Sequence, residues 1–359
     1  MPVSLPRPRA VLPALAFALA LAAVLASSAM ASSGSLYTQT NDRAGNTVQR
    51  FDRSPSGELT PAGTFATGGA GLAGLGGRQG AVELSGDGRY LYAVNAGSDS
   101  VSVFRVGHRR PDLVDVVSSR GVAPVSIAEH RGRVYVLNSG GTPSVSAYWR
   151  WFDGSLKAIP GGTRELAPGA AGAAQVSVTP GGRSLVVSER VSNRLETLSL
   201  DRLGRPGAPV VTASSGAVPF GFGITRQGTI VVSEAGASTV SSYRTGADGS
   251  LRTVSASLPV GQGAACWAAV SPNGRFAYTG NAAGGISGFA IARDGSLTAL
   301  GTTTLLPSPR DLDFDESGRF LHAVSPGGQV SSYRVGHDGS LTLAGTAPAA
   351  AGITGAAAS

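Results

Sequence analysis

One short phrase recurs along the chain at nearly constant spacing. GRYLYAVN (88–95) returns as GRVYVLN (132–138), GRSLVVSE (182–189), GTIVVSE (228–234), GRFAYTGN (274–281) and GRFLHAVS (318–325), and a degenerate first copy, SLYTQTN, stands at 35–41. The leading glycine recurs every 44 to 50 residues. A second strand-like phrase follows each copy. A period of this size, made of β-rich phrases and turn residues, is typical of propeller blades. The sequence therefore predicts an all-β fold, a seven-bladed β-propeller.

Each repeat contains enough strand and turn signals for four antiparallel strands. The first two strands are joined by short turns such as SGDGR, SPNGR and DESGR, and the last two by FDGS, ADGS, RDGS and HDGS. Asp-Gly between alternating strands favours a tight hairpin, because both residues tolerate positive φ. Both turn sets should emerge on one face of the disc. The more variable loops should emerge on the other face, where function usually lies.

The two ends of the chain are expected to close the ring together. The first repeat has no strand ahead of its phrase, whereas the tail GITGAAAS (352–359) has the length and position of an innermost strand. We expect this C-terminal segment to complete the first blade, because a closed ring leaves no exposed sheet edge there.

The N-terminus has the pattern of a secretory signal. Arg7 and Arg9 precede the apolar run 11–26, and Ala29-Met30-Ala31 is a small-x-small cleavage site. The run is short for a membrane span. We expect a signal peptide at 1–31, a single propeller domain at 32–359, a secreted monomer, and no membrane span after cleavage.

The charge pattern argues against nucleic acid as a partner. The net charge is +7, but the arginines are scattered through turn positions, with no interleaved aromatic and basic stripe. The four histidines and the single cysteine, Cys266, form no zinc spacing or nucleophilic triad. We therefore expect no metal and no cofactor.

Aligning the repeats gives one polar residue at the end of each second strand. These residues are Asn41, Asn95, Asn138, Glu189, Glu234, Asn281 and Ser325. Seven equivalent positions should form a ring near the channel mouth. Glu189 and Glu234, in adjacent blades, are candidates for a general acid/base pair, because neighbouring carboxylates shift each other's pKa. The same ring could instead hold a hard cation, or its members could bind loop backbone groups.

Residues that open the innermost strands should reach the same mouth. Arg78, Gln79 and Arg310 are candidates to bind a substrate carboxylate or phosphate, together with Asn95 and Asn281 of the ring. Arg310 could also pair locally with Asp311 or Asp313.

The segment SPNGRFAYTGNAAGGISGFAIARDGSLT (271–298) resembles the lactonase-type seven-bladed propellers, which include bacterial 6-phosphogluconolactonase and fungal carboxymuconate cyclase. The resemblance covers residues 35–359. It implies that a lactone ring is opened or closed on a small anionic molecule in the central channel, without a metal. Members of the group often carry a Pro-His pair at the start of the innermost strand. The matching positions here hold Gly80, Pro124, Ala174, Phe220, Cys266 and Arg310, so no histidine matches that pattern.

Three hypotheses follow for the function. The first is an exported lactonase-like enzyme in which Glu189 or Glu234 is the acid/base and Arg78 or Arg310 anchors an anion. The second is a non-catalytic propeller that binds a glycan, a peptide or a surface partner. The third is a metal-dependent lactonase that uses the Glu/Asn ring.

Overall fold

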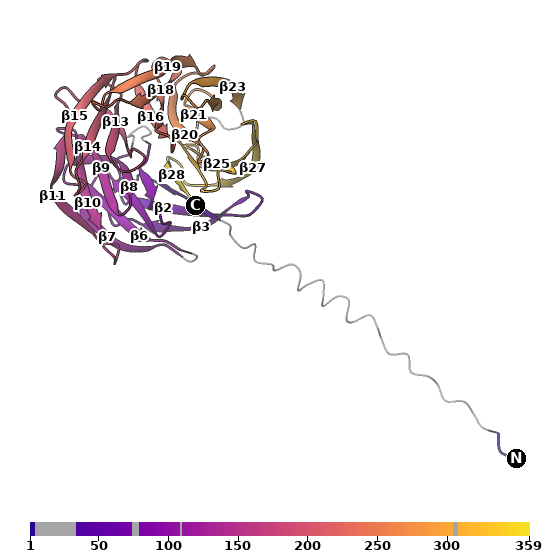
Figure 1. Cartoon of the computed structure of the whole chain (residues 1–359). Helices are drawn as coiled ribbons and strands as arrows, with labels where there is room; N and C mark the ends of the chain where they lie inside the picture. The colour runs from indigo at the N-terminus through magenta and orange to yellow at the C-terminus, as the bar shows by residue number, and fades with distance from the viewer. Residues whose placement is uncertain (4–33, 74–78, 108–109, 304–307) are drawn as a thin grey trace. The chain divides into compact units, whose positions relative to one another are not determined.

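A computed structural model describes residues 1–3, 34–73, 79–107, 110–303 and 308–359. The predicted signal peptide, 1–31, lies outside the described residues except for its first three. Residues Ser33–Ser359 form a compact unit of their own. In the described part of this unit, 28 strands make seven four-stranded antiparallel sheets, arranged in a ring (Figure 1).

Each blade runs from an innermost strand a to an outermost strand d. Blade 1 is β28 (Thr354–Ala358), β1 (Gly34–Gln39), β2 (Thr47–Arg53) and β3 (Leu59–Ala66). Blade 2 is β4 (Val82–Leu84), β5 (Tyr90–Asn95), β6 (Ser100–Arg105) and β7 (Asp112–Ser118). Blade 3 is β8 (Val122–His130), β9 (Arg133–Gly140), β10 (Ser144–Arg150) and β11 (Leu156–Glu165). Blade 4 is β12 (Ala173–Val178), β13 (Ser184–Glu189), β14 (Arg194–Leu200) and β15 (Pro206–Ala213).

The remaining three blades have the same order of strands. Blade 5 is β16 (Pro219–Ile224), β17 (Thr229–Glu234), β18 (Thr239–Thr245) and β19 (Leu251–Pro259). Blade 6 is β20 (Ala265–Val270), β21 (Phe276–Asn281), β22 (Ile286–Ile291) and β23 (Leu297–Thr303). Blade 7 is β24 (Asp311–Phe314), β25 (Phe320–Ser325), β26 (Gln329–Val335) and β27 (Leu341–Pro348). The predicted fold class, with four antiparallel strands per blade, is confirmed.

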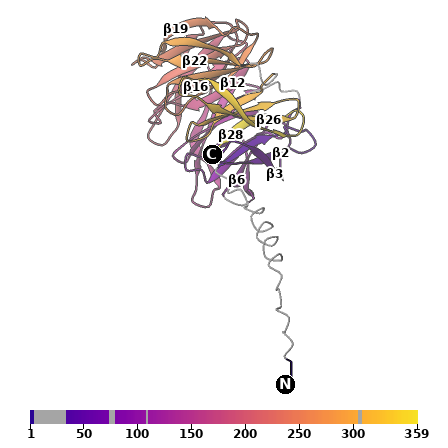
Figure 2. The same cartoon turned by 90° about the vertical axis from the view of Figure 1, so that its right-hand side faces the viewer.

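The ring closes as the sequence predicts. β28 pairs with β1 in antiparallel register, Leu36 opposite Ala358 and Tyr37 opposite Ala357. Figures 1 and 2 show the yellow β28 beside the indigo strands of blade 1. The last strand of the chain is therefore the innermost strand of the first blade, and no strand edge is left open at this joint.

The hydrophobic core lies between neighbouring blades. Alternate residues of each strand face opposite neighbours, as the period of two requires. In β25, Leu321 and Ala323 pack against blade 6, whereas Val324 packs against Leu36 and Phe51 of blade 1. The repeated phrase is thus a core phrase, buried on both sides of the sheet.

The glycine that leads each phrase has a backbone reason to recur. Gly274, in the a–b turn of blade 6, has φ +70, a conformation that residues with a Cβ atom rarely adopt. In the c–d turn of blade 3, a Cβ on Gly154 would collide with the ring of Tyr90. The a–b and c–d turns lie on one face of the ring. The more variable b–c and d–a loops lie on the other face, where each strand a begins.

Candidate functional site

Glu234 closes β17 and is fully enclosed by hydrogen-bond donors. Its carboxylate accepts from the hydroxyls of Thr239 at 2.5 Å and Ser241 at 2.7 Å, and from the backbone N–H of Gly216 at 2.7 Å. Ser214 Oγ adds a fourth bond at 3.2 Å. Ser214 and Gly216 belong to the loop between blades 4 and 5. The carboxylate therefore fastens this loop to blade 5.

Glu189 has the same position in blade 4 and a different set of partners. Its carboxylate accepts from Ser192 Oγ at 2.5 Å and from the backbone N–H of Ala171 at 3.2 Å, and it forms an ion pair with Arg194 at 3.1 Å. Arg194 also pairs with Glu196 at 3.0 Å. Burial, reinforced by Glu189, raises the pKa of Glu196 to about 8. Two buried carboxyl groups thus share one guanidinium. Because the pKa of Glu196 is raised, Glu196 binds a proton more readily, and this reduces the negative charge that is buried beside Arg194.

The asparagines of the same ring are also bonded within the joints between blades. Asn95 donates to Ser102 Oγ at 2.7 Å and accepts from Asn46 of blade 1 at 3.0 Å. Asn281 donates to Ser287 Oγ at 2.9 Å and to Gln262 Oε1 at 3.1 Å. Both asparagines are buried, and each connects its own blade to a loop of the neighbouring blade. A catalytic or substrate-binding role for the members of the ring stays a prediction.

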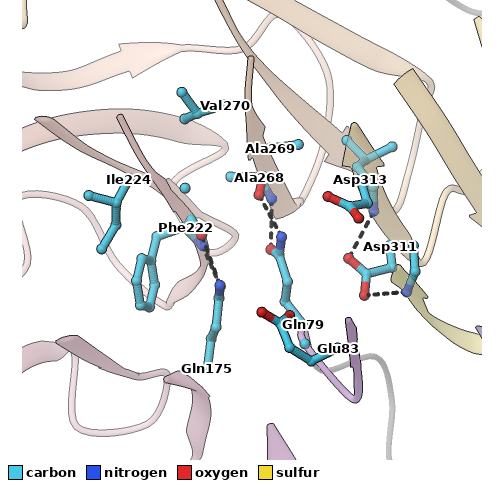
Figure 3. A pocket seen from close by; sticks show the side chains of 14 residues that line it. Gln79, Glu83, Gln175, Phe222, Ile224, Ala268, Ala269, Val270, Asp311 and Asp313 are labelled. Carbon is cyan, nitrogen blue, oxygen red and sulfur yellow. Dashed lines mark hydrogen bonds between the residues drawn. The ribbon is translucent and has the colours of Figure 1, made fainter. Parts of the chain in front are cut away.

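Two glutamines bridge innermost strands within the central channel (Figure 3). Gln79, ahead of β4 in blade 2, donates to the carbonyl of Ala268 at 2.5 Å and accepts from its N–H at 2.9 Å, in blade 6. Gln175 makes the same pair with Phe222, at 2.9 and 2.6 Å. Each side-chain amide is thus occupied by backbone in the structure. Arg78, the predicted neighbour of Gln79, lies outside the described residues.

On the side of these bridges toward the a–b turns, the channel holds a cavity of about 190 Å³, which we call the chamber. Its polar lining includes Glu83 of β4 and Asp311 and Asp313 of β24 (Figure 3). Asp311 and Asp313 accept hydrogen bonds from the backbone N–H groups of Ala356 and Ala358, at 3.1 and 2.8 Å. The acidic wall of the chamber is therefore built on the strand that closes the ring.

The carboxyl groups of the chamber favour their neutral forms. Burial raises the pKa of Asp313 to about 7, against its hydrogen bonds from Ala358 and Phe314. Burial first, and then the charges of Asp313, Glu129 and Asp311, raises the pKa of Glu83 well above its ordinary value. Glu83 keeps a partly accessible side chain, because the cavity reaches it. Carboxyl groups of this kind are suited to proton transfer near neutral pH.

At the other end of the channel, where strands a begin, the ionisable groups are basic in place of acidic. We call this end the mouth; it includes Arg190, Phe220, Cys266, Trp267 and Arg310. The Arg190 guanidinium stacks over the Phe220 ring at 5.1 Å, and Phe220 meets Trp267 edge-on at 5.5 Å. Burial raises the pKa of the Cys266 thiol to about 11, and the charges that oppose this shift most are those of Arg190 and Arg310.

Neither arginine of the mouth has a carboxylate partner among the described residues. Burial lowers the pKa of Arg190. A half-buried guanidinium without a counter-charge is costly for a folded protein. Two of them beside one thiol make the mouth a place where an anion would be stabilised. Arg310 does not pair with Asp311 or Asp313, whose carboxylates are engaged with blades 1 and 7.

Sequence reasoning missed Arg190 and Glu83, although the repeats contain a sign of both. The residue that follows the polar ring is Asp42 in the first copy and uncharged in the others, such as Ala96, Ser139 and Ala282, so Arg190 stands out as the one cation in that column. In strand a, the position of Glu83 is taken by an acid in blade 7, Asp313, but by Gly223 and Ala269 in blades 5 and 6. A comparison of the columns beside the ring would have found them.

Neither a metal cluster nor a membrane helix is found in the part of the chain that the structure describes. That part contains no group of three His, Cys, Asp or Glu side chains arranged to hold a metal ion. It also contains no helix long and apolar enough to cross a membrane.

Similarity to known proteins places the chain in a family. The family model described as lactonase, 7-bladed β-propeller, matches residues 38–148, 154–268 and 262–354. No curated protein sequence matches the chain significantly. Among solved structures, the chain is similar to a putative 6-phosphogluconolactonase from Bacteroides fragilis, with a TM-score of 0.73, 17% identity, and coverage of 92% of this chain and 99% of that one.

Two further structures show the breadth of the fold. The periplasmic gluconolactonase of Pseudomonas aeruginosa gives a TM-score of 0.70 at 17% identity, with 90% and 98% of the two chains covered. AztD from Citrobacter koseri gives 0.60 at 13% identity, with 91% and 98% covered. Likenesses at this identity show the fold alone. The family model covers most of the sequence, so the chain belongs to the lactonase family of seven-bladed β-propellers.

Proposed function

We propose that this protein is an exported lactonase that binds a small anionic lactone at the mouth of the channel and opens its ring. The observation that carries the proposal is the pair Arg190 and Arg310, which flank Cys266 without a carboxylate partner among the described residues. Guanidinium groups hold carboxylates and phosphates with good geometry. The rings of Phe220 and Trp267 supply an apolar surface for the body of the ligand.

Lactone hydrolysis needs water, a group that transfers a proton, and positive charge near the carbonyl oxygen. Hydrolysis adds water across the acyl C–O bond: the hydroxyl goes to the carbonyl carbon, and the proton goes to the ring oxygen, which becomes an alcohol. The arginines would hold the anionic substituent and offset the negative charge that develops on the carbonyl oxygen. Glu189 and Glu234 remain the proposed acid/base groups. They lie at the ends of β13 and β17, next to the loops that border the mouth.

Export is supported by the pattern at 1–31, and the lactone class by family membership. The Pseudomonas aeruginosa relative, named a periplasmic gluconolactonase, is in keeping with both. Fractionation of cells that express the full chain tests export. We expect the protein in the periplasm or medium, with an N-terminus near residue 32 by mass spectrometry. An intact N-terminus in the cytosol would count against it.

The activity is tested with a panel of carboxylated, phosphorylated and uncharged lactones, each with and without chelator. We expect turnover of an anionic lactone that the chelator does not affect. Arg190→Gln and Arg310→Gln should each lower kcat/KM by about tenfold to a hundredfold, the usual worth of a charge-assisted hydrogen bond. Arg275→Gln, on an exposed a–b turn, is the matched control and should leave the rate unchanged. Equal losses on uncharged lactones would argue against an anion site.

A second candidate function is a non-catalytic binding propeller, and one observation favours it. The carboxylates of Glu189 and Glu234 are both fully buried and already occupied by donors. If no lactone is turned over, and Glu189→Gln and Glu234→Gln change only stability, then the mouth is a binding site. Titration calorimetry with citrate and gluconate would then measure the anion binding alone, and Arg310→Gln should abolish it.

A further inference from the structure

The c–d turns of four blades share one backbone geometry, which makes them internal controls for each other. In each, the residue that opens the turn donates its N–H to the carbonyl of a serine four positions on: Trp151 to Ser155 at 2.9 Å, Gly246 to Ser250 at 2.7 Å, Ala292 to Ser296 at 2.9 Å, and Gly336 to Ser340 at 2.8 Å. The Asp-Gly-Ser that follows makes the same side-chain bonds in each turn. The turn therefore needs Asp-Gly-Ser and is indifferent to the two residues before it.

Two residues precede Asp-Gly-Ser in each of these four turns, and only in blade 3 are both of them large and apolar. Trp151 and Phe152, which we call the aromatic tip, stand where blade 5 has Gly246 and Ala247. Trp151 is 50% exposed and Phe152 is 88% exposed, and their ring centroids are 6.4 Å apart. Neither ring contributes to a core at this exposure. Two large apolar side chains at a convex hairpin end, where small or polar residues would serve the fold equally, indicate contact with something outside the protein.

Arg105 and Lys157 lie near the aromatic tip, together with Asp153 of the turn itself and Asp112, which is paired with Arg105 in the sheet. Arg105, from β6 of blade 2, donates to the backbone carbonyl of Asp153 at 2.9 Å, directly beneath the tip. Lys157, on β11, is paired with Trp149 in the sheet, and its charge is among the causes that lower the pKa of Asp153, after the hydrogen bonds from Ser155. The bonds that Asp153 accepts from Ser155 keep its carboxylate ionised, so this carboxylate offsets one of the nearby cations.

The same surface continues onto blade 4. The indole N–H of Trp149 donates to the carbonyl of Leu203 at 3.2 Å, and Arg133 donates to the carbonyl of Arg202 at 2.7 Å. Leu203 is exposed as well. Trp149 and Arg133 of blade 3 thus brace against the c–d turn of blade 4, which adds Leu203, Arg202 and the ion pair of Arg205 with Asp201 to the surface.

We propose that the aromatic tip anchors this protein to the surface of an anionic lipid bilayer. A convex end cannot enclose a sugar or a small ligand, which is bound in concave sites. It can enter the interfacial layer of a membrane, where Trp and Phe are favoured, while the arginines and lysine around it meet anionic headgroups. The anchor lies on the turn face, opposite the mouth, and leaves the channel mouth open to solvent. It does not depend on the proposed lactonase activity.

Flotation with lipid vesicles tests the proposal. The protein used is residues 32–359, since residues 34–359 contain all seven blades and the strand that closes them. It is mixed with vesicles of phosphatidylglycerol and phosphatidylcholine in equal parts, or of phosphatidylcholine alone. We expect binding to the anionic vesicles, lost at high salt, and quenching of tryptophan fluorescence by brominated acyl chains. Converting the tip to the blade 5 sequence, W151G/F152A, should lower the partition coefficient by about tenfold or more and abolish the quenching.

Two controls separate the tip from general charge attraction. Arg293→Ala changes the residue of blade 6 that corresponds to Phe152 and removes one exposed cation. It should leave binding within about twofold, because screened surface charge acts only over a Debye length. Arg105→Gln should weaken binding to anionic vesicles only. The proposal is overturned if wild type binds both vesicles equally or neither, or if W151G/F152A binds and is quenched like wild type. If wild type binds neither vesicle, a protein or glycan partner becomes the better explanation for the tip.

Discussion

The two ends of the central channel differ in their ionisable groups, which are basic at the mouth and acidic in the chamber. The mouth has two arginines without carboxylate partners among the described residues, beside a buried thiol. The chamber has three carboxyl groups, two of which hold the strand that closes the ring. The bridges made by Gln79 and Gln175 lie between them. The comparison suggests that the ionisable groups of the channel have two separate roles: the arginines of the mouth can receive a ligand, and the carboxyl groups of the chamber hold the closing strand by hydrogen bonds.

The largest expected effect is the loss of thermal stability when the strand that closes the ring beside the chamber is removed. Removing residues 350–359 deletes β28, its pairing with β1, and the N–H groups that bind Asp311 and Asp313. It also opens the core cluster that Ile353 and Ala356 share with Leu36. We expect the melting temperature to fall by more than about 10 °C. Removing residues 1–31 is the control and should leave it unchanged. Equal melting curves for the two deletions would mean that the carboxylates do not fasten the ring.

The second prediction tests whether Glu234 acts in lactone turnover at the mouth or stabilises the contact between neighbouring blades. Glu234→Gln replaces one acceptor oxygen by an N–H₂ group among donors, so buried groups lose partners. We expect it to lower the free energy of unfolding by about 1–3 kcal/mol in urea denaturation. Glu316→Gln, on an exposed turn, should change it by less than about 0.5 kcal/mol. A Glu234→Gln protein of native stability that has lost lactone turnover would assign this residue to the mouth.

The third effect is a pH dependence that originates in the chamber. The folded pKa of Asp313 is about 7, against an ordinary value of 3.8. Between these two values the unfolded chain has released this proton and the folded chain keeps it. The stability that Asp313 contributes therefore falls as the pH rises from about 4 to about 7, and is constant above that. Asp313→Asn should flatten this part of the profile of melting temperature against pH. Parallel profiles for the two proteins would show that Asp313 is ionised in the fold.

The smallest effect concerns the bridge between the two ends. Gln79→Ala leaves the N–H and carbonyl of Ala268 to water, which can reach the channel, so we expect a loss of about 1 kcal/mol of stability. If the substrate stays at the mouth, the KM for an anionic lactone should change by less than about twofold. A rise in KM of tenfold or more would place the substrate against Gln79, as the sequence pattern suggests.

Much of the fold was predictable, because the repeats place turn glycines and strand phrases at fixed positions. The tail strand 352–359 was predictable for the same reason: one repeat lacked its first strand, and a closed ring had to supply it. The candidate site was less so. Glu189 and Glu234 were correctly aligned, but alignment fixes which strand end a residue occupies, not the direction of its side chain. That direction depends on donors such as Ser241 and Arg194, which come from later strands.

The join between β1 and β28 also sets the order in which this molecule can be made. Leu36 lies in the first strand of the ring along the chain and its partner Ala358 in the last, so Leu36 is made long before Ala358. Blades 2 to 7 can form as they emerge, but the first blade must wait until β28 has been made. Until then, β1 presents an unpaired edge that other chains could capture.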